Sequence, residues 1–433
     1  MNLTNEIKSY LERLFPICRS LTGDGNRETF RILKEIVPLN TIEYKSGSKV
    51  YDWTIPDEWN VRDAWIKDSV GNKLVDFSDT NLHLVGYSEP IHRKMHFVEL
   101  AKHLHVHQNL TEHVPYRTSY YERNWGFCVT EKQLLTLSSS NGKLEVFVDS
   151  KLDPKGSLTI GELLIPGHSE KEILISTYIC HPSLANDNLS GVVMTAFLAR
   201  EILKKNNLNY SYRILWVPET IGAISYCAMN ESEMKKIQCG MVVTTVGGPG
   251  NYGYKQSYNS KHSINLAIEE IFRNEGIEFI TYPFDIHGSD ERQYSSQGFR
   301  INVASVTKDK YYEYPYYHSS ADDLKFVCPK RINQSMKIYS KILDKLDREK
   351  IYKNKFPNCE VMLSKHGLYP KIGGNLLPIQ GRETEIDTIL SILWMSDGKT
   401  GVYEIANNIK VNEGLVISIS ADLCSRGIMK QLA

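Results

Sequence analysis

The chain has 433 residues, of which 41% are hydrophobic and 24% are charged, so it is long enough for two or three folded units. Lys and Arg together number 51, as do Asp and Glu, and this zero net charge gives no indication of nucleic acid or an anionic membrane as a partner. Charged residues interrupt the first 30 positions, and no stretch has the roughly 20 apolar residues that cross a bilayer, so we expect a cytoplasmic protein without a signal peptide.

Two amphipathic helices are predicted at the start of the chain. Ile7, Leu11 and Leu14 recur at helical spacing, and Asp24 is positioned to cap a second helix that runs to residue 36. These helices begin a main domain that we place at residues 1–46 and 126–352.

The stretch between these two parts has a different composition. Short aromatic and β-branched runs are interrupted by proline and glycine, which is typical of strands joined by turns. We therefore predict an inserted, mostly β subdomain at residues 47–125. Within it, His103, His105 and His107 would share one face of a strand and could bind a metal, but they follow a helical pattern, so a surface histidine cluster is the favoured interpretation.

Strands and helices alternate from residue 144 onward. The strand at 171–180 is apolar on both faces, as a central strand of a sheet should be. The alternation predicts an α/β fold with a mixed, mostly parallel sheet, helices on both faces, and ligands at the carboxyl ends of the strands. The predicted strands cover residues 144–150, 157–167, 171–180, 212–219, 239–248 and 301–307, and the predicted helices cover 190–205, 222–230, 262–276 and 329–350.

A third unit is predicted at residues 353–433, after a break at 355–381 that is rich in proline and glycine. Three short helices follow, with a tight turn between the second and the third, which resembles a winged-helix or helix-turn-helix module; a small packing or dimerisation module is the alternative. From Ile386 to the end there are four basic and five acidic residues, a charge of −1, whereas a DNA-binding module normally has a basic surface. We therefore expect this module to contact a protein or a second copy of the chain rather than nucleic acid.

The first candidate metal ligands follow the strand at 171–180. His181 and Asp187 lie in a turn that leads into a helix, and they offer a neutral nitrogen and an anionic oxygen, both of which Zn²⁺ accepts. In the alternative interpretation, Asp187 and Asn188 only cap that helix. The eight cysteines include no CxxC pair, so we expect neither a cysteine zinc site nor a disulfide framework.

Two further groups are expected at the same edge of the sheet. The strand at 212–219 ends in Glu219, which could take a proton from water beside a metal, with a helix cap again as the alternative. His318 lies in a loop before the last helix, and Asp322 could either orient its imidazole or cap that helix. Five tyrosines in the same loop favour a pocket over a purely structural role.

With these groups in place, the chain resembles the zinc aminopeptidases with two co-catalytic metal ions, and more closely a bacterial family associated with polysaccharide biosynthesis that has an aminopeptidase-like domain. The resemblance implies that His181, Asp187 and His318 are metal ligands, that Glu219 is the general base and that Tyr317 helps to stabilise an oxyanion. It covers nearly the whole chain and rests on the segments RSLTGDG (19–25), YDWTIPDEW (51–59), VPYRTSYY (114–121), NWGFC (124–128), CHPSLANDNLSG (180–191), GSDERQY (288–294) and YPYYHSSADDL (314–324).

Two positions depart from the zinc aminopeptidases. Thr220 stands where that family has a ligand glutamate, and Thr245 stands where it has a ligand aspartate. Because threonine is a poor zinc ligand, we expect a single zinc ion on the three ligands named above, with two ions as the alternative. Asp290 and Glu291 could be replacement ligands, although a supporting role around the site is favoured. Mn²⁺, Fe²⁺ and Co²⁺ would also accept these ligand types.

The expected function is hydrolysis of an amide bond in a small peptide or another amide. One alternative is an amidohydrolase or deacylase that acts on a sugar-linked amide in polysaccharide biosynthesis. Another is a metal-binding interaction protein that has lost catalysis, and DNA-linked regulation is a third. Tyr254, Lys255, Tyr258, Asn259 and Arg292 are expected to line the substrate pocket, although each could equally be a surface or packing residue.

Overall fold

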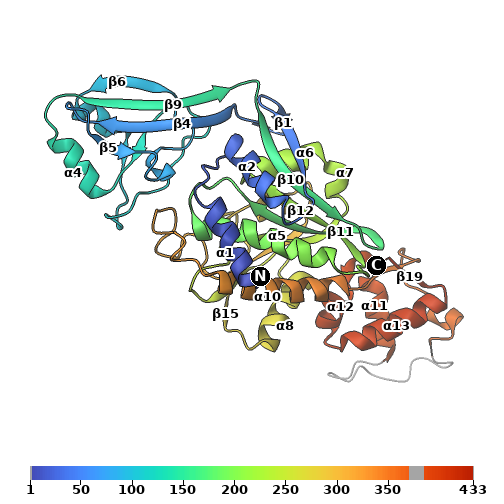
Figure 1. The fold of residues 1–433 in the computed structure, drawn as a ribbon. Coiled ribbons are helices and arrows are strands. Elements are labelled where there is room, and N and C mark those ends of the chain that lie inside the picture. Colours follow the sequence, from blue (N-terminus) through green and yellow to red (C-terminus); the bar gives the residue numbers. More distant parts are fainter. Residues whose placement is uncertain (1, 370–384, 433) are drawn as a thin grey trace.

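The computed structural model describes residues 2–369 and 385–432 of the protein and is built around an eight-stranded sheet (Figure 1). The strand order is β1-β10-β12-β11-β13-β16-β14-β15, with four parallel and three antiparallel pairings. The predicted mixed, mostly parallel sheet is therefore confirmed. Its strands are β1 (Asn40–Lys45), β10 (Ser157–Ile165), β12 (Tyr210–Val217), β11 (Ser169–Tyr178), β13 (Ile237–Val243), β16 (Asn302–Thr307), β14 (Tyr252–Lys255) and β15 (Phe279–Tyr282).

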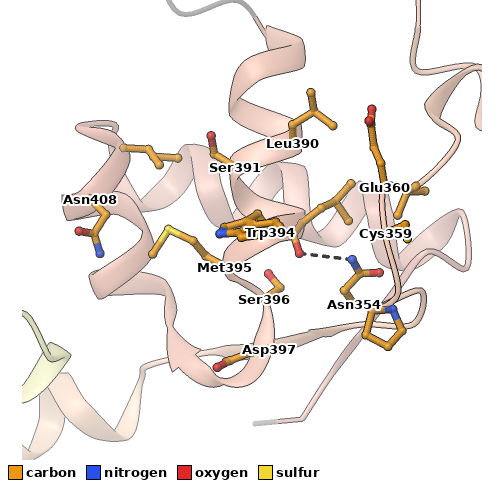
Figure 2. Close-up of a pocket in the computed structure, with 14 residues that line it drawn as sticks. Asn354, Cys359, Glu360, Leu390, Ser391, Trp394, Met395, Ser396, Asp397 and Asn408 are labelled. Atoms are coloured by element: carbon orange, nitrogen blue, oxygen red, sulfur yellow. Dashed lines mark hydrogen bonds between the residues drawn. The ribbon is translucent and has the colours of Figure 1, made fainter.

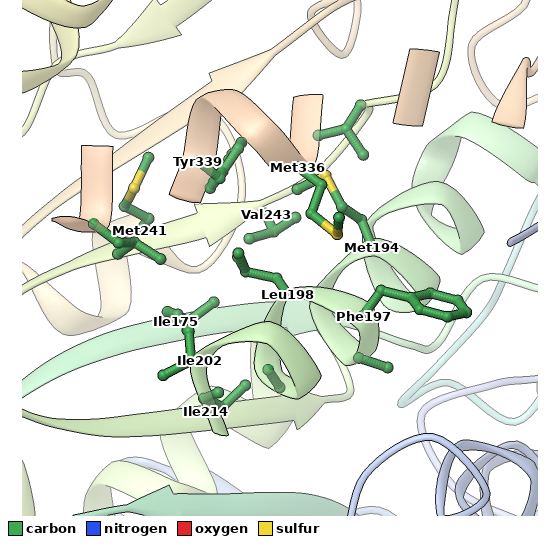
Figure 3. Close-up of a cluster of buried hydrophobic side chains, with 14 of the residues drawn as sticks. Ile175, Met194, Phe197, Leu198, Ile202, Ile214, Met241, Val243, Met336 and Tyr339 are labelled. Atoms are coloured by element: carbon green, nitrogen blue, oxygen red, sulfur yellow. The ribbon is translucent and has the colours of Figure 1, made fainter. Parts of the chain in front are cut away.

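Helices cover both faces of this sheet, as predicted, and each face has its own hydrophobic core. Figure 3 shows part of the first core, where Leu198 and Ile202 of α5 lie with Met336 of α10 over the sheet residues Ile175 and Val243. Full burial of one such side chain contributes about 1.5–3 kcal/mol, so this core is a main source of stability. The helices of the first face are α1 (Leu3–Leu14), α2 (Asp24–Leu33), α5 (Ser190–Leu203), α8 (Ser263–Asn274) and α10 (Pro329–Asp347), and those of the second are α6 (Ile221–Met229), α7 (Glu231–Met234) and α9 (Glu291–Tyr294).

A second, four-stranded sheet of order β5-β4-β9-β6 lies at one end of the molecule (Figure 1). The predicted end of the inserted subdomain at residue 125 is too early, because β9 pairs with β4 and β6 and the small sheet thus extends to residue 153. Alternating burial identifies β9 as a strand but does not indicate which sheet it joins. The elements here are β2 (Lys49–Val50), β3 (Trp53–Thr54), β4 (Glu58–Lys67), β5 (Lys73–Asp76), η1 (Asn81–His83), β6 (Ile91–Met95), α3 (Phe97–Leu100), η2 (Ala101–His103), β7 (Leu104–His105), β8 (Phe127–Cys128), α4 (Glu131–Ser139) and β9 (Leu144–Asp153).

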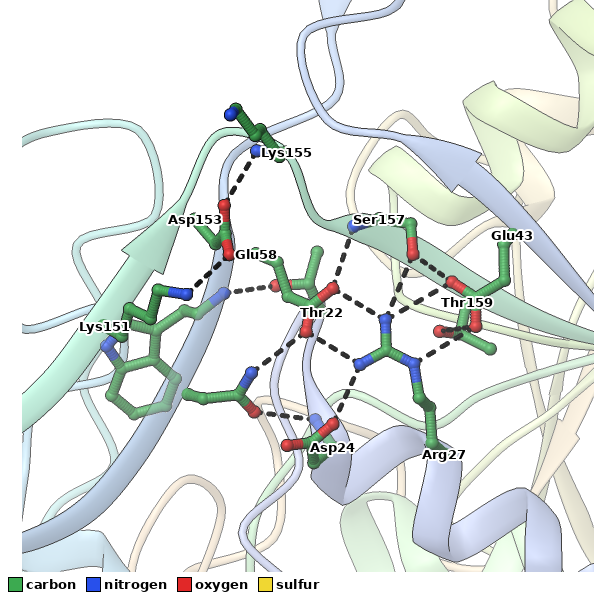
Figure 4. A network of polar contacts seen from close by, with 12 residues as sticks. Thr22, Asp24, Arg27, Glu43, Glu58, Lys151, Asp153, Lys155, Ser157 and Thr159 are labelled. Carbon is green, nitrogen blue, oxygen red and sulfur yellow. Dashed lines mark hydrogen bonds and ion pairs between the residues drawn. The ribbon is translucent and has the colours of Figure 1, made fainter.

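Arg27 of α2 connects the two sheets through a network of ion pairs (Figure 4). Its Nη2 lies 2.6 Å from Oε2 of Glu58 in β4, and its Nε lies 3.2 Å from Oε1 of Glu43 in β1. Asp24 accepts a further bond from Arg27 Nη1 at 2.9 Å. One guanidinium therefore compensates carboxylates that belong to a helix and to strands of both sheets.

The C-terminal module lies at the opposite end of the molecule and confirms the predicted winged-helix architecture (Figure 1). It has its own hydrophobic core and a three-stranded sheet of order β18-β17-β19. The second part of the predicted break rich in proline and glycine, residues 370–381, lies outside the described residues. The elements are β17 (Ile351–Asn354), η4 (Leu363–His366), α11 (Glu385–Met395), β18 (Asp397–Gly401), α12 (Val402–Ile409), α13 (Glu413–Ser425) and β19 (Met429–Gln431).

Three smaller expectations concern membrane spans, cysteines and the histidines of the inserted segment. Among the described helices, none is long and apolar enough to cross a bilayer. All eight cysteines are free. His103 stacks on Trp125, and His107 accepts backbone N–H groups with Nδ1, so these two side chains have separate partners.

Candidate metal centre

Three neighbouring strands bring the candidate residues to one edge of the central sheet. β12, β11 and β13 are adjacent and parallel, so their carboxyl ends lie side by side. His181 follows the end of β11 by three residues, and Glu219 follows the end of β12 by two. The edge is therefore where an open α/β sheet usually binds its ligands.

His181, Asp187 and His318 converge there, although they are far apart in the sequence. One potential ligand atom from each lies within 4.8 Å of those from the other two. Asp187 Oδ2 is 3.1 Å from His318 Nε2 and 3.9 Å from His181 Nε2. Both Asp187 Oδ2 and His318 Nε2 are buried without a hydrogen-bond partner among the described residues. Two facing polar atoms left unsatisfied in this way fit a site that holds a metal ion.

The protonation states of the buried pair suit metal binding. Burial lowers the pKa of His181 to about 4, which leaves the imidazole neutral at physiological pH. Burial pushes the pKa of Asp187 upward, but His181, His318 and Tyr178 together outweigh it and hold the value at about 2. The site thus offers one carboxylate and a neutral imidazole, the forms that coordinate a metal.

Asp322 supports the loop that carries Asp187. Its carboxylate accepts the backbone N–H groups of Asn186 at 2.6 Å and Asp187 at 2.9 Å, and Tyr314 donates its hydroxyl at 2.9 Å. The predicted contact of Asp322 with the imidazole of His318 is therefore replaced by contacts with the backbone. Asp322 does not cap the last helix either, because α10 begins at Pro329.

The alternative in which the carboxylates only cap helices is wrong for this structure. Helix α5 has Leu189 at its N-cap and helix α6 has Thr220, and neither end is capped by a side chain. Asp187 instead accepts a hydrogen bond from the Tyr178 hydroxyl.

Glu219 lies beside the three-residue cluster. Its carboxylate, Cys180 and His181 form a second group with potential ligand atoms within 4.8 Å of one another. Burial, followed by the charges of Asp290 and Asp187, raises the pKa of Glu219 well above its ordinary value. A carboxyl group in this environment holds a proton more readily than one in water, as a general acid or base near neutral pH requires.

Backbone strain gathers at the same edge. Thr220, Thr245 and His318 have φ values of 62°, 48° and 53°, in the left-handed region that residues with side chains rarely adopt. Each such residue costs about 1–3 kcal/mol, and residues of this kind cluster at functional sites. Asp290 Oδ1 accepts the N–H of Thr220 at 2.7 Å and so holds the strained turn after Glu219.

A cavity of about 320 Å³ opens above this edge. Tyr317 stacks on the imidazole of His318 with ring centroids 3.9 Å apart, and Arg292 also lines the cavity, as predicted. Gly288 can only be glycine, since its φ is 128° and a Cβ there would lie 2.4 Å from the Tyr311 hydroxyl. The lining residues are Tyr116, Arg117, Thr118, Tyr120, Tyr178, His181, Glu219, Gly288, Ser289, Arg292, Tyr311, Tyr312, Tyr317 and His318.

The segment around Tyr116 lies at the site, although no site role was predicted for it. The ring centroid of Tyr116 lies 5.1 Å from the ring centroids of both His181 and His318, and the Tyr116 N–H donates to the His318 carbonyl at 2.8 Å. The segment belongs to the stretch inserted between the two parts of the main domain. The cluster of tyrosines in this segment is a signal that could have suggested a pocket-lining role, although it does not indicate the contact with His318.

Several predicted pocket residues lie elsewhere. Tyr254 is fully buried in the first core, where it packs against Phe272. Lys255 is buried and pairs with Glu291 at 3.0 Å and Asp285 at 2.9 Å. Both predictions failed because residues 252–255 form β14, a short strand hydrogen-bonded to β16 and β15.

Tyr258 and Asn259 line a different cavity of about 410 Å³, next to the C-terminal module. Glu291 is fully buried, with its carboxylate held by Lys255 and by the Tyr311 hydroxyl at 3.1 Å. Glu291 and Asp290 are absent from the two groups of potential ligands found among the described residues. They support the loop of Gly288–Arg292, in agreement with the favoured supporting role.

The C-terminal module has a larger cavity of about 1010 Å³ (Figure 2). Trp394, which is 88% exposed, Met395 and Leu390 lie at its wall, and Asn354 Nδ2 donates to the Leu393 carbonyl at 3.3 Å. None of the described groups of potential metal ligands lies there. Size alone therefore does not identify the functional site.

Comparison with known proteins agrees with this architecture. Residues 8–349 match the model of a domain of unknown function, DUF4910, and residues 350–431 match a winged helix-turn-helix. A Clostridium acetobutylicum protein described as a candidate polysaccharide biosynthesis protein with an aminopeptidase-like domain is 41% identical over 403 residues, which cover 93% of this chain and 90% of the relative.

Solved structures show the same fold. A candidate peptidase from Clostridium acetobutylicum has a TM-score of 0.79 and 38% identity, covering 99% of this chain and 96% of its own. BSAP, a zinc aminopeptidase from Bacillus subtilis, has a TM-score of 0.56 at 12% identity, covering 79% of this chain and 94% of its own, which is a likeness of fold. With its family model spanning 342 of the 433 residues, the chain belongs to the DUF4910 family and has an aminopeptidase-like fold with a C-terminal winged helix.

Proposed function

We propose that this protein is a zinc-dependent hydrolase that cleaves an amide bond, with Glu219 as its general base. The observation that carries the proposal is the pair of buried, unpartnered atoms Asp187 Oδ2 and His318 Nε2, which face each other 3.1 Å apart beside Glu219. A scaffold protein has no evident need for a carboxylate with a raised pKa in the same cavity as two imidazoles.

His181, Asp187 and His318 would hold the ion, and zinc bound there would lower the pKa of water and polarise a carbonyl. Glu219 accepts a proton from the attacking water and then delivers it to the leaving amine, a role that the burial-raised pKa of its carboxyl group favours. Tyr317, fixed by stacking on His318, donates its hydroxyl proton in a hydrogen bond to the oxygen on which negative charge develops. Tyr116 covers both imidazoles and limits the access of other water molecules.

One ion rather than two is the favoured arrangement. Thr220 and Thr245, where the zinc aminopeptidases have carboxylates, offer only neutral hydroxyls at the edge of the sheet. Asp290 is not a replacement ligand in this arrangement, because it belongs to neither group of potential ligand atoms found among the described residues, and its Oδ1 accepts the N–H of Thr220. The same two threonines favour the second candidate function, a metal-binding interaction protein without catalysis.

The substrate is a small amide, either a peptide or an N-acyl sugar. Similarity to the relative described as a candidate polysaccharide biosynthesis protein favours an N-acyl sugar as the substrate. A panel of aminoacyl anilides and N-acetylated amino sugars, tested with zinc-loaded protein, separates the two.

The decisive variant is Glu219→Gln, which keeps the shape of the side chain but removes its basicity. We expect turnover to fall by at least about a hundredfold while zinc binding is retained. Glu170→Gln, an exposed position at the start of β11, is the matched control and should behave as wild type. Full activity in Glu219→Gln removes this residue from the mechanism, and a wild-type chain that binds no zinc removes the proposal itself.

A further inference from the structure

Two arginines line the cavity above the metal centre without a direct carboxylate partner. Arg117 and Arg292 both line it, and neither forms an ion pair with any described carboxylate. Arg117 Nη1 donates to the backbone carbonyl of Tyr116 at 3.0 Å. Arg117 thus enters the cavity wall from the inserted segment, whereas Arg292 enters it from α9 of the main domain.

Arg292 is half-buried, and its guanidinium has few hydrogen-bond partners among the described residues. Its Nη1 donates to the Ile286 carbonyl at 3.1 Å and its Nη2 reaches Thr220 Oγ1 only at 3.4 Å. Its Nε is buried and has no hydrogen-bond partner among the described residues. A guanidinium offers five N–H donors in a planar fork that matches a carboxylate, so these unused donors indicate a missing anionic partner.

The charges around the cavity also indicate an anionic ligand. The acidic groups at the site are Asp187, Glu219 and Asp290, and burial raises the pKa of Asp290 to about 7. A divalent ion with the two arginines therefore leaves at least one positive charge uncompensated. A substrate with a free α-ammonium group would add to this surplus, whereas a carboxylate would neutralise it.

The dimensions and the walls limit the size of that substrate. A volume of about 320 Å³ is at the lower end of the range for small-ligand sites, which suits a single sugar or amino acid unit. Tyr116, Tyr120, Tyr311 and Tyr312 supply aromatic faces and hydroxyls to its walls. Such a lining suits a compact polar molecule with an apolar face.

We infer that the cavity accepts an acidic N-acyl compound, a small amide with a carboxylate beside the scissile bond, and that Arg292 binds this carboxylate. The inference rests on the proposed amide hydrolysis and names its substrate class. In the reaction, the bond between the carbonyl carbon and the nitrogen breaks. The oxygen of the water joins the carbon and gives a second carboxylic acid, and a proton from the water joins the nitrogen and gives an amine. Arg292 is a binding residue in this scheme, and the free N-terminus of a peptide is disfavoured.

Two pairs of probes are nearly isosteric, differ in charge and cover the two sides of the bond. Succinyl- and succinamoyl-p-nitroanilide test a carboxylate on the acyl side, and N-acetylalanine and N-acetylalaninamide test it on the amine side. We expect the anionic member of one pair to have a kcat/KM at least about tenfold above its neutral partner in the zinc-loaded protein. Arg292→Gln should abolish this difference, whereas Arg62→Gln, an exposed arginine of the small sheet, should retain it.

A binding measurement keeps this test separate from catalysis. Calorimetry with the zinc-loaded Glu219→Gln variant should show tighter binding of the anionic member, and adding Arg292→Gln should remove that advantage. Charge-dependent binding without any turnover upholds the inference and contradicts the proposed function. Two results would overturn the inference and leave amide hydrolysis in place. One is turnover of leucyl-p-nitroanilide in preference to both anionic probes, and the other is a preference for anions that persists in Arg292→Gln.

Discussion

Arg19 Nε donates a hydrogen bond to the backbone carbonyl of His181 at 3.1 Å, although the two residues are separated by 162 positions. Arg19 Nη1 donates to the Leu14 carbonyl at 2.6 Å, and the side chain is 1% exposed. Burial lowers the pKa of Arg19 to about 10, so the guanidinium stays charged at neutral pH. The N-terminal segment thereby fixes the turn that carries the first metal ligand.

Arg19→Gln should therefore weaken metal binding without removing a ligand. We expect a zinc affinity about tenfold lower, measured by competition with a chelator, because the His181 turn loses its charged donor. Arg62→Gln serves as the control. An unchanged zinc affinity in a folded Arg19→Gln protein would show that the contact only supports the fold.

Asp187 is expected to determine whether a metal binds at all. Zinc should raise the unfolding temperature of the wild-type chain in proportion to the logarithm of its concentration, since binding stabilises the folded state alone. Asp187→Asn should abolish this rise, whereas the exposed Asp79→Asn should retain it. Metal analysis should give one zinc per wild-type chain, and two per chain would establish the dinuclear alternative.

Arg27 should be worth more to stability than an ordinary surface ion pair. Arg27→Met leaves the Glu58 side chain, which is 10% exposed, without its cation, so we expect a loss of about 2 kcal/mol in urea unfolding. The Arg27 side chain itself is 33% exposed, and solvent screening keeps the loss below that for a fully buried pair. Arg31→Met, whose partner Glu28 lies on the surface of the same helix, should change the free energy of unfolding far less, because solvent screens this exposed pair.

Glu349 should make the stability of the C-terminal module depend on pH. Its carboxylate accepts the N–H of Tyr403 at 3.3 Å, and burial raises its pKa from 4.5 to about 7. A carboxyl group with a raised pKa in the folded state stabilises the protein fully below pH 4.5, and this contribution is lost as the pH rises towards 7. We expect the unfolding temperature to fall between pH 4.5 and pH 7, by an amount that corresponds to at most about 3 kcal/mol.

Glu349→Gln tests this assignment. The variant should show a smaller fall in unfolding temperature over the same interval, because its side chain does not ionise. Part of the pH dependence of the unfolding temperature should remain in the variant, because burial also raises the pKa values of Asp290 and Asp322 to about 7. The exposed Glu12→Gln should follow the wild type, and an identical pH profile in Glu349→Gln would contradict the prediction.

The winged helix should not bind DNA by electrostatic attraction. Helices α12 and α13, the pair joined by the tight turn, contain three carboxylates, Glu404, Glu413 and Asp422, and no Lys or Arg. A gel shift at low salt should show no retardation of duplex DNA. Retardation that weakens steeply with added salt would assign a nucleic-acid role to the module in place of protein contact.

Much of the main sheet could be predicted because its central strands and helices have strong periodicity. His181 and Glu219 were found since each directly follows an apolar strand, and the order of parallel strands then places them together. Tyr254 was misplaced because a four-residue strand that contains glycine has too little pattern to distinguish it from a loop. Tyr116 was missed because its contact with His318 joins segments about 200 positions apart, and no local signal encodes such a pairing.

The hydrogen bond from the Tyr116 amide to the His318 carbonyl joins two segments that are far apart in the sequence. The entrance to the site is therefore formed by both segments. Amino acid changes in the inserted segment can reshape the entrance while the metal ligands stay untouched. Relatives with the same three ligands can therefore diverge in substrate preference through this segment alone. Exchanging residues 114–121 between two such proteins should transfer specificity without rebuilding the catalytic centre.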